Sequence, residues 1–262
     1  MTLNLEKVGQ PIAQIVGGEM NGKIIYINTD EDADNLIKKP IKNMIQLKNG
    51  RLQPIRDTTK EREVLYIFGA SGSGKSTYVK NYVKTQRKLE KKKIPVYLFS
   101  YLDEDESLDE IEPMRIRLDD SLLENPISLD EFEEGSIIVY DDVDCIPNKP
   151  LRQYLIALAN EILQVGRHYK LNIIFTSHLP TLKNESRIIL AECHHIVYFP
   201  KCGGNGRQTN YLLKEYLGLD KKIISMLKNS KSRWANISTR YPNYCMNDRM
   251  IKLLNNDDDE SD

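Results

Sequence analysis

Short apolar runs recur along the middle of the chain and are separated by polar or amphipathic stretches. Nearly continuous apolar runs that alternate with helical stretches are typical of a parallel sheet whose crossover helices cover both faces. We therefore predict an α/β fold with a mostly parallel central sheet flanked by helices. The expected strands are Val64–Phe68, Val96–Phe99, Ile137–Tyr140, Asn172–Phe175 and Ile196–Phe199.

One amphipathic helix is expected between the third and fourth of these strands. Apolar residues recur at helical spacing from Leu151 to Val165, directly after Pro150 and directly before Gly166. Proline is favoured at the start of a helix and glycine just after its end, so the pattern predicts both boundaries. Weaker patterns predict two further short helices and a strand, at Tyr211–Tyr216, Lys222–Leu227 and Arg233–Ile237.

The two ends of the chain differ from this central block. Residues 1–60 contain short apolar runs and a basic stretch without a strong helical period, so we expect a small β-rich extension there. The sharper pattern that follows assigns residues 61–200 to the core domain and residues 201–254 to a C-terminal extension of that core. The last six residues, 257–262, are almost all acidic, and the tail 255–262 is expected to be disordered.

Composition narrows the classes of protein that need to be considered. The longest apolar stretches fall far short of the roughly 20 residues that a membrane-spanning helix needs, so no membrane span is expected. Residues Met1–Lys7 lack the apolar core of a secretory signal, so we expect an intracellular, reducing compartment for the four cysteines. The formal net charge of -1 means that any contact with nucleic acid has to come from a local patch.

The strongest motif is a phosphate-binding loop between the first expected strand and a helix that begins near Lys75. Residues 69–76 read GASGSGKS and fit the pattern G-x-x-x-x-G-K-[ST] in full. Its glycines let backbone N–H groups point at phosphate oxygens, while Lys75 is suited to bridge the β- and γ-phosphates and Ser76 to ligate Mg²⁺. The alternative is an ordinary glycine-rich turn before a helix. The expected ATP-binding residues are Gly69, Ala70, Ser71, Gly72, Ser73, Gly74, Lys75, Ser76 and Thr77.

Two carboxylates, Asp141 and Asp142, end the apolar strand Ile137–Tyr140. Parallel strands gather ligands at their carboxyl ends, so this motif and the phosphate-binding loop should open onto one crevice. Because neighbouring side chains on a strand point in opposite directions, we expect Asp141 to hold Mg²⁺ and Asp142 to polarise the attacking water from a different spot. The alternative is that Asp142 and Asp144 only form the turn after the strand.

Three polar residues, Thr176, Ser177 and His178, follow the strand Asn172–Phe175. If this strand lies beside the strand of the phosphate-binding loop, these side chains can hydrogen-bond the γ-phosphate or the attacking water. They would then sense hydrolysis. The alternative for His178 is a histidine that only packs against a helix or loop.

Arg167 lies at the other end of the same strand. Seven or more residues at about 3.3 Å each separate it by more than about 20 Å from the phosphate crevice. A catalytic Arg167 must therefore act as an arginine finger on the ATP of a neighbouring subunit, which requires a ring or another head-to-tail oligomer. The alternative is that Arg167 binds the C-terminal carbonyls of the preceding helix.

Three segments carry a resemblance to a known family. The GASGSGKS loop, the sequence VYDD at residues 139–142 and the run Gly166–Pro180 resemble the FtsK–HerA superfamily of DNA-pumping ATPases. Within it, the double aspartate and the sequence Ser-Arg-Trp at residues 232–234 are similar to the poxvirus-type genome-packaging ATPases of large DNA viruses and virophages. The resemblance spans about residues 60–254 and is most specific in the run Gly166–Pro180.

The resemblance implies a RecA/FtsK-like sheet with an additional strand, in which the strand before Thr176 lies between the two motif strands. It places His178 where relatives carry a sensor glutamine. It also implies a pentameric or hexameric ring that threads double-stranded DNA through its pore. Many relatives have glutamate at the position of Asp142, and the shorter side chain here needs a closer backbone or passes its role to a water or to Asp144.

The expected function is ATP hydrolysis with Mg²⁺, coupled to translocation of double-stranded DNA that packages a viral genome into its capsid. The expected catalytic residues are Lys75, Asp142, His178 and Arg167. Such a motor acts in the virion or viral factory of a host cell, and capsid proteins are expected partners. The alternatives are a cellular or plasmid DNA pump of the same superfamily, a P-loop nucleotide or small-molecule kinase, and a nucleotide-dependent switch with negligible turnover.

Two basic segments near the C-terminus are candidate DNA contacts. The segment Lys201–Asn210 is expected to be either a flexible loop that follows a phosphate backbone or the tip of a surface hairpin. A second group of cations could bind DNA or could be a solvated helix face, and consists of Lys221, Lys222, Lys228, Lys231 and Arg233.

Overall fold

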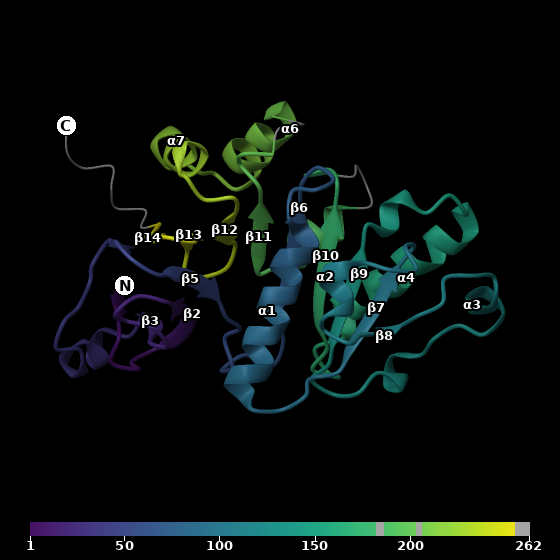
Figure 1. The fold of residues 1–262 in the computed structure, drawn as a ribbon, viewed down its shortest axis with the longest axis horizontal. Coiled ribbons are helices and arrows are strands. Elements are labelled where there is room, and N and C mark those ends of the chain that lie inside the picture. The colour runs from purple at the N-terminus through teal and green to yellow at the C-terminus, as the bar shows by residue number, and fades with distance from the viewer. Residues whose placement is uncertain (182–185, 203–205, 255–262) are drawn as a thin grey trace.

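The computed structural model describes residues 1–181, 186–202 and 206–254. The acidic tail expected at residues 255–262 lies outside these described residues. A ten-stranded sheet forms the centre of the molecule (Figure 1). Its strands, in spatial order, are β4 (Met44–Gln46), β14 (Met250–Leu253), β13 (Tyr244–Asn247), β12 (Ala235–Ser238), β11 (His195–Tyr198), β6 (Val64–Phe68), β10 (Asn172–Ser177), β9 (Ile137–Asp141), β7 (Val96–Ser100) and β8 (Met114–Arg115).

The sheet has a parallel half and an antiparallel half. The strands from β11 to β8 are parallel to their neighbours, whereas β12, β13, β14 and β4 extend the β11 edge as antiparallel strands. Strand β10 lies between β6 and β9, with Ser177 opposite Phe68 and Thr176 opposite Asp141. This order confirms the expected α/β class and the additional strand between the two motif strands.

Alternate side chains on each central strand support helices on opposite faces of the sheet. On β6, Val64, Tyr66 and Phe68 belong to one apolar cluster, and Leu65 and Ile67 belong to the other. The second cluster is covered by α1 (Lys75–Glu90) and by α2 (Glu106–Asp109). The first is covered by α4 (Lys149–Val165), α5 (Ser186–Glu192), a π-helix (Leu212–Tyr216) and α7 (Lys221–Asn229).

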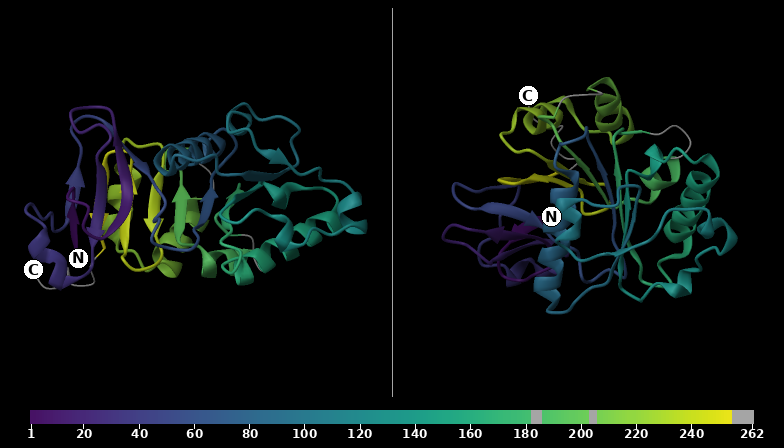
Figure 2. Two further views of the ribbon diagram at one scale, coloured as in Figure 1. Left: turned by 90° about the horizontal axis from the view of Figure 1, so that it is seen from below. Right: turned by 45° about the vertical axis from the view of Figure 1, so that its right-hand side comes forward.

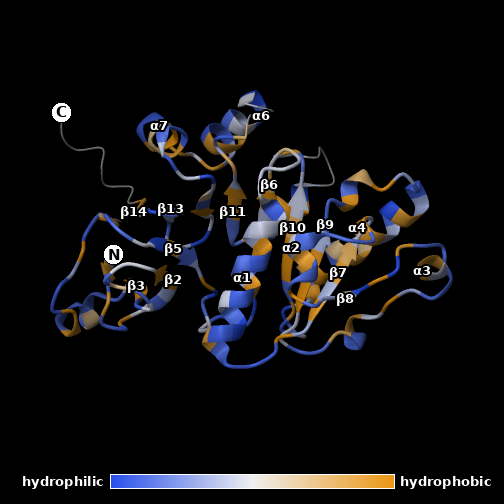
Figure 3. Cartoon of the chain, viewed as in Figure 1, coloured by the Kyte–Doolittle hydropathy of each residue, from blue (hydrophilic) through white to orange (hydrophobic). Residues whose placement is uncertain are grey.

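Apolar residues concentrate on the strands, while α1 turns a largely hydrophilic face to the solvent (Figure 3). On α4, the side chains of Leu155 and Ile162 are completely buried. Truncating such a residue to alanine typically costs about 2–5 kcal/mol, so α4 fixes the strands beneath it firmly. Helix α6 (Gly206–Tyr211), α3 (Ser121–Glu124) and three 3₁₀ helices (Glu31–Leu36, Leu129–Glu131 and Val143–Cys145) complete the helical elements of the described residues.

The predicted elements of the core are present, with small shifts at their ends. Helix α4 begins at Lys149, because Asn148 caps it by accepting from the backbone N–H of Leu151, and Pro150 falls in its first turn. The helix predicted at Tyr211–Tyr216 is divided between the end of α6 and the π-helix.

A second, four-stranded antiparallel sheet forms the N-terminal part of the molecule. Its strands, in spatial order, are β1 (Thr2–Asn4), β3 (Ile24–Asn28), β2 (Gln10–Val16) and β5 (Arg51–Pro54). Its apolar face shares one buried cluster with β13 and β14, so the N-terminal sheet packs against the antiparallel half of the central sheet. Figure 2 shows it at one end of the elongated molecule. Among the described residues, no helix has the length and apolar character needed to cross a bilayer.

Candidate nucleotide-binding site

The phosphate-binding loop connects β6 to α1 at the carboxyl edge of the parallel strands. The backbone N–H of Gly69 donates to the carbonyl of Ser177 on β10 at 3.0 Å, which ties the start of the loop to the additional strand. A side chain at Gly69 would bring a Cβ within 2.7 Å of Ser73 Oγ. Gly74, with φ at +109°, precedes the first residue of α1 in a conformation that favours glycine. The loop therefore needs glycine at these positions.

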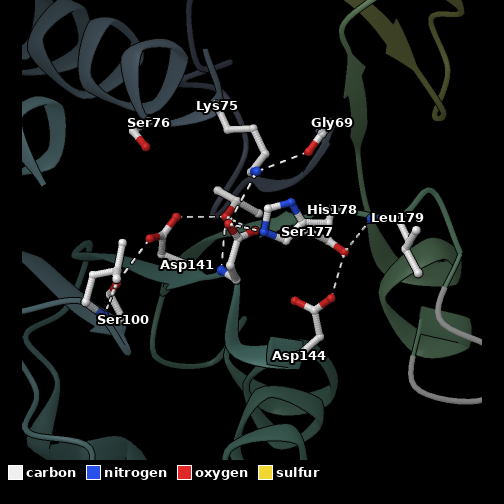
Figure 4. A network of polar contacts seen from close by, with 12 residues as sticks. Gly69, Lys75, Ser76, Ser100, Asp141, Asp144, Ser177, His178 and Leu179 are labelled. Carbon is white, nitrogen blue, oxygen red and sulfur yellow. Dashed lines mark hydrogen bonds and ion pairs between the residues drawn. The ribbon is translucent and has the colours of Figure 1, made fainter. Parts of the chain in front are cut away.

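Lys75 lies buried in this loop, and its ammonium group points at the ends of the neighbouring strands (Figure 4). Its Nζ donates to the carbonyl oxygen of Gly69 at 3.1 Å and forms an ion pair with Asp142 Oδ2 at 3.3 Å. The phosphate-binding loop and the aspartate pair at the end of β9 are thus in direct contact, at the position predicted for the nucleotide crevice.

Asp141 is buried at the end of β9 and is held by two hydroxyl groups. Thr176 donates to its Oδ1 at 2.8 Å, and Ser100 donates to its Oδ2 at 3.1 Å (Figure 4). Burial, followed by the neighbouring charge of Asp142, raises the pKa of Asp141. The Asp141 carboxylate is therefore fixed in position, and a bound cation would compensate its buried negative charge.

Asp142 does not point away from Asp141 as the strand pattern predicted. Its φ of +46° is in the left-handed region, which Asp tolerates better than most residues, so the alternation of the strand ends at Asp141. The hydroxyl of Thr176 donates to Asp141 and also lies 3.2 Å from Asp142 Oδ1. The two carboxylates therefore converge on one threonine instead of facing different spots.

His178 also contacts Asp142, with its Nε2 3.1 Å from Asp142 Oδ2. Asp144, the alternative water activator, is placed differently, because it accepts from the hydroxyl of Ser177 at 3.2 Å. Burial, followed by the charge of Asp142, raises the pKa of Asp144. Lys75, Asp142 and His178 thus form one cluster, and Asp144 lies beside it.

The chemistry of the oxygen atoms at this site fits Mg²⁺. Mg²⁺ in nucleotide sites is usually bound through one or two carboxylates or hydroxyls together with substrate phosphates and waters. Ser76 and Asp141 offer a hydroxyl and a carboxylate on the wall of the same cleft. The described residues contain no group of three or more His, Cys, Asp or Glu side chains arranged for a metal.

Asp105 contacts the phosphate-binding loop, although no sequence motif marks it. The hydroxyl of Ser76 donates to Asp105 Oδ2 at 3.0 Å. Asp105 belongs to the acidic run Asp103–Glu106, which follows β7 and which composition alone assigns to solvent. The available signal was its position just after a buried strand, at the edge where the other site residues gather.

The loop opens onto a cleft of about 980 Å³. The cleft is lined by loop residues 71–77, by the start of α1, and by Asp105 and Ser107. It is also lined by Arg51 and Gln53 of the N-terminal sheet and by Arg233 and Trp234, which precede β12. The N-terminal sheet is therefore part of the cleft that contains the phosphate-binding loop.

Arg167 lies outside this cleft, at the opposite edge of the sheet. It follows α4 and precedes β10, and its guanidinium forms an ion pair with Glu61, which precedes β6. The C-terminal carbonyls of α4, the alternative partners considered for Arg167, instead accept from Arg62. That side chain donates to the carbonyls of Ile162 at 2.7 Å and Leu163 at 2.6 Å.

The segment Lys201–Asn210 differs from both structures expected for it. Residues 206–210 belong to helix α6, while residues 203–205 lie outside the described part of the chain. Lys201 Nζ donates to the backbone carbonyl of Lys228 at 3.0 Å, so this cation is used to attach the segment to α7.

Comparisons with known proteins identify the family. No protein-family model matches the chain. The uncharacterized protein V3 of Sputnik virophage is 37% identical over 254 residues, which cover 96% of this chain and 98% of that protein. Among solved structures, the cytoplasmic domain of the type VII secretion ATPase EccC of Thermomonospora curvata has a TM-score of 0.50 at 13% identity, over 80% of this chain and 28% of that chain.

A second solved structure is the genome packaging NTPase B204 of Sulfolobus turreted icosahedral virus 2, in complex with AMPPCP. It has a TM-score of 0.47 at 13% identity, over 74% of this chain and all of that chain. The chain therefore shares its fold with the EccC ATPase domain, and it belongs to the same family as the virophage protein V3.

Proposed function

We propose that this P-loop ATPase is a motor that couples ATP hydrolysis to translocation of double-stranded DNA, and that it packages a viral genome into a capsid. One observation carries the catalytic part of the proposal. Lys75, Asp142 and His178 meet at the carboxyl ends of three adjacent parallel strands. This is the arrangement that hydrolysis of a bound triphosphate requires.

Each residue of the cluster has a chemical role in this proposal. Backbone N–H groups of residues 69–77 bind the phosphates, and Lys75 leaves Asp142 to contact the β- and γ-phosphates. Ser76 and Asp141 hold Mg²⁺, which when bound neutralises charge on the phosphate oxygens. Asp142 then accepts a proton from the attacking water.

Thr176 and His178 link the phosphate end of the site to the carboxylate that acts on water. Both side chains contact Asp142, and Thr176 also contacts Asp141. A change in the position of Asp142 on hydrolysis would therefore reach β10 directly. We assign His178 to sensing the γ-phosphate on this basis.

Arg167 cannot serve the cleft of its own subunit, because it lies at the other edge of the sheet. We propose that it enters the site of a neighbouring subunit as an arginine finger in a pentameric or hexameric ring. Its side chain is exposed and its present partner, Glu61, is also exposed. Such a surface ion pair is weak and can be exchanged at an interface.

DNA as the substrate and the capsid as a partner are proposed from the sequence resemblance and from the virophage relative. The motor would then act in the virion or in the viral factory of the host cell.

The test is the ATPase rate with and without long double-stranded DNA, across a protein dilution series. We expect DNA to stimulate hydrolysis, and the stimulation to vanish on dilution as the oligomer dissociates. Displacement of a third strand from a DNA triplex should report translocation directly, and the Lys75→Ala chain is the matched control without nucleotide binding. Concentration-independent transfer of phosphate to a small acceptor, without an effect of DNA, would instead identify a kinase.

A further inference from the structure

Asp105 is attached to the phosphate-binding loop by a hydrogen bond whose direction matters. A serine hydroxyl has one proton and two lone pairs, and a metal ion can only use a lone pair. Ser76 directs its proton to Asp105 Oδ2, at 3.0 Å. The lone pairs of Ser76 Oγ thereby remain available to a cation in the cleft.

Asp141 is already engaged with other hydroxyl groups. Its two oxygens accept from Thr176 and from Ser100, at 2.8 Å and 3.1 Å. Ser76 donates its hydroxyl proton instead to Asp105, which follows β7, and not to Asp141, which ends β9.

Asp105 is held rigidly enough to orient its neighbour. Its Oδ1 accepts from the backbone N–H groups of Ser107 and Leu108, at 2.9 Å and 2.8 Å, and so caps α2. Its own backbone N–H donates to Asp109 Oδ2 at 2.9 Å. One carboxylate oxygen is therefore fixed by the cap, and the other is aimed at Ser76.

Helix α2 is in turn fixed on α1. Glu110, just after α2, accepts from Lys80 at 2.8 Å and from Lys84 at 2.6 Å, and Leu108 is completely buried in the apolar cluster beneath α1. The hydroxyls of Thr77 and Ser107 lie 3.3 Å apart. Asp105 is thus carried by a docked element that lines the same cleft as Ser76.

We propose that Asp105 is a positioning residue of the nucleotide site, which orients the Ser76 hydroxyl so that its lone pairs face the magnesium of Mg·ATP. The inference rests on the proposed ATPase function. It predicts that Asp105 acts on the Mg²⁺-dependent part of nucleotide binding and has no effect on the part that is independent of Mg²⁺.

The variant Asp105→Asn separates this role from simple capping of α2. Asparagine caps helices as well as aspartate does, so the cap at Oδ1 and the thermal unfolding midpoint are preserved. The amide nitrogen that replaces Oδ2 donates hydrogen bonds and cannot accept the proton of Ser76. The hydroxyl then has to turn its proton away from Asp105 and towards the metal position.

The readout is fluorescence of a mant-ATP probe, titrated with Mg²⁺ present and then in EDTA. Loss of a group that orients a metal ligand typically lowers metal affinity about 10- to 100-fold, so we expect at least a tenfold weaker response to Mg²⁺ in Asp105→Asn. Binding in EDTA should equal that of the parent chain. Glu112→Gln is the matched control, because it neutralises an exposed carboxylate nearby that pairs with Lys93 and contacts neither Asp105 nor Ser76, and its response to Mg²⁺ should not change.

A double-mutant comparison tests the route through Ser76. In a Ser76→Ala background the hydroxyl is absent, so adding Asp105→Asn should have no further effect on the response to Mg²⁺. Additive effects, or a parent-like response of Asp105→Asn, would overturn the inference while leaving the ATPase proposal intact. If the parent chain itself binds mant-ATP without any gain from Mg²⁺, both the proposed function and the inference fail.

Discussion

Lys75 and Asp142 form an ion pair at 3.3 Å inside the nucleotide-binding cleft. Lys75 is expected to bind the phosphates and Asp142 to activate water. In the nucleotide-free protein their charges therefore neutralise each other. A triphosphate competes with Asp142 for Lys75, and Asp142 is then left with the contacts from Thr176 and His178. Under the proposed function, this single ion pair couples the binding of ATP to the release of Asp142.

We expect Asp142→Asn to abolish hydrolysis while ATP binding is kept or becomes tighter. The amide cannot take a proton from water, and loss of general base catalysis typically costs about 10²- to 10⁴-fold in rate. It also removes the charge that competes with phosphate for Lys75. Single-turnover hydrolysis and mant-ATP binding measure the two effects separately.

The Lys75→Ala chain is the control for this experiment, because it should lose binding and hydrolysis together. Hydrolysis that persists in Asp142→Asn would transfer the role to Asp144 or to an ordered water. A parent chain that binds ATP with negligible turnover would instead indicate a nucleotide-dependent switch.

His178→Gln should retain most of the ATPase activity, whereas His178→Ala should lower it. Glutamine can still hydrogen-bond Asp142, as His178 Nε2 does at 3.1 Å, while alanine leaves that carboxylate without this partner. Steady-state ATPase rates with DNA at saturation distinguish the two variants. Equal rates in His178→Ala and the parent chain would indicate that the histidine only packs against its surroundings.

Arg167→Ala should lower the ATPase rate by about 10³-fold or more, because an arginine finger has an effect of that size. Mixing this variant with Lys75→Ala subunits should restore part of the ATPase rate. The Lys75→Ala subunits cannot hydrolyse ATP themselves, but they retain Arg167. With random assembly of equal amounts, about a quarter of the interfaces would pair a working loop with a working arginine. The ATPase rate of the mixture, measured above the concentration of assembly, reports this recovery.

Lys170→Ala is the control for the mixing experiment. Lys170 is also exposed near the same edge and pairs with Glu134, so its loss removes a comparable surface charge. It should leave the rate close to that of the parent chain. Absence of any recovery in the mixture would contradict action of Arg167 between subunits.

Asp141→Asn should raise the thermal unfolding midpoint of the nucleotide-free protein at pH 7. Burial, followed by the charge of Asp142, raises the pKa of Asp141 in the folded state, so its ionised form opposes folding at neutral pH. As the pH falls through this raised pKa towards the unfolded value of about 3.9, the folded parent chain takes up the proton first and regains stability. The advantage of the variant should therefore shrink on acidification.

Calorimetry at pH 7 and at successively lower pH measures this difference. Asp119→Asn is the control, and it should lower the unfolding midpoint at pH 7 instead of raising it, since a hydrogen bond from Ser121 lowers the pKa of that exposed carboxylate. A lower midpoint for Asp141→Asn at pH 7 would show that its hydrogen bonds with Thr176 and Ser100 outweigh the burial of charge.

Much of the central sheet could be predicted from the sequence, because its strands are buried on both faces and read as unbroken apolar runs. Strand β6 has the predicted bounds, and β9 and β10 extend only one or two residues further. The loop motif located the phosphate end of the site, since its glycines and Lys75 stand at fixed spacing. The order of the strands came from the family resemblance and could not be obtained from periodicity.

Other features depend on contacts that no local pattern contains. Strands β13 and β14 are short, and β4, the other partner of β14, lies far away in the chain, so these pairings left no periodic signal. The convergence of Asp141 and Asp142 follows from one backbone angle at Asp142. Asp105 was concealed in an acidic run, because charge runs are usually solvated and only the contact with Ser76 reveals its position.

Because β4 pairs with β14, with Ile45 opposite Ile251, the N-terminal part of the chain can complete its packing only after the last strand has been translated. The N-terminal strands emerge from the ribosome first, but their apolar face stays uncovered until β13 and β14 have been translated. Because the same N-terminal sheet forms a wall of the cleft, a nascent chain that already contains the phosphate-binding loop still lacks a closed site.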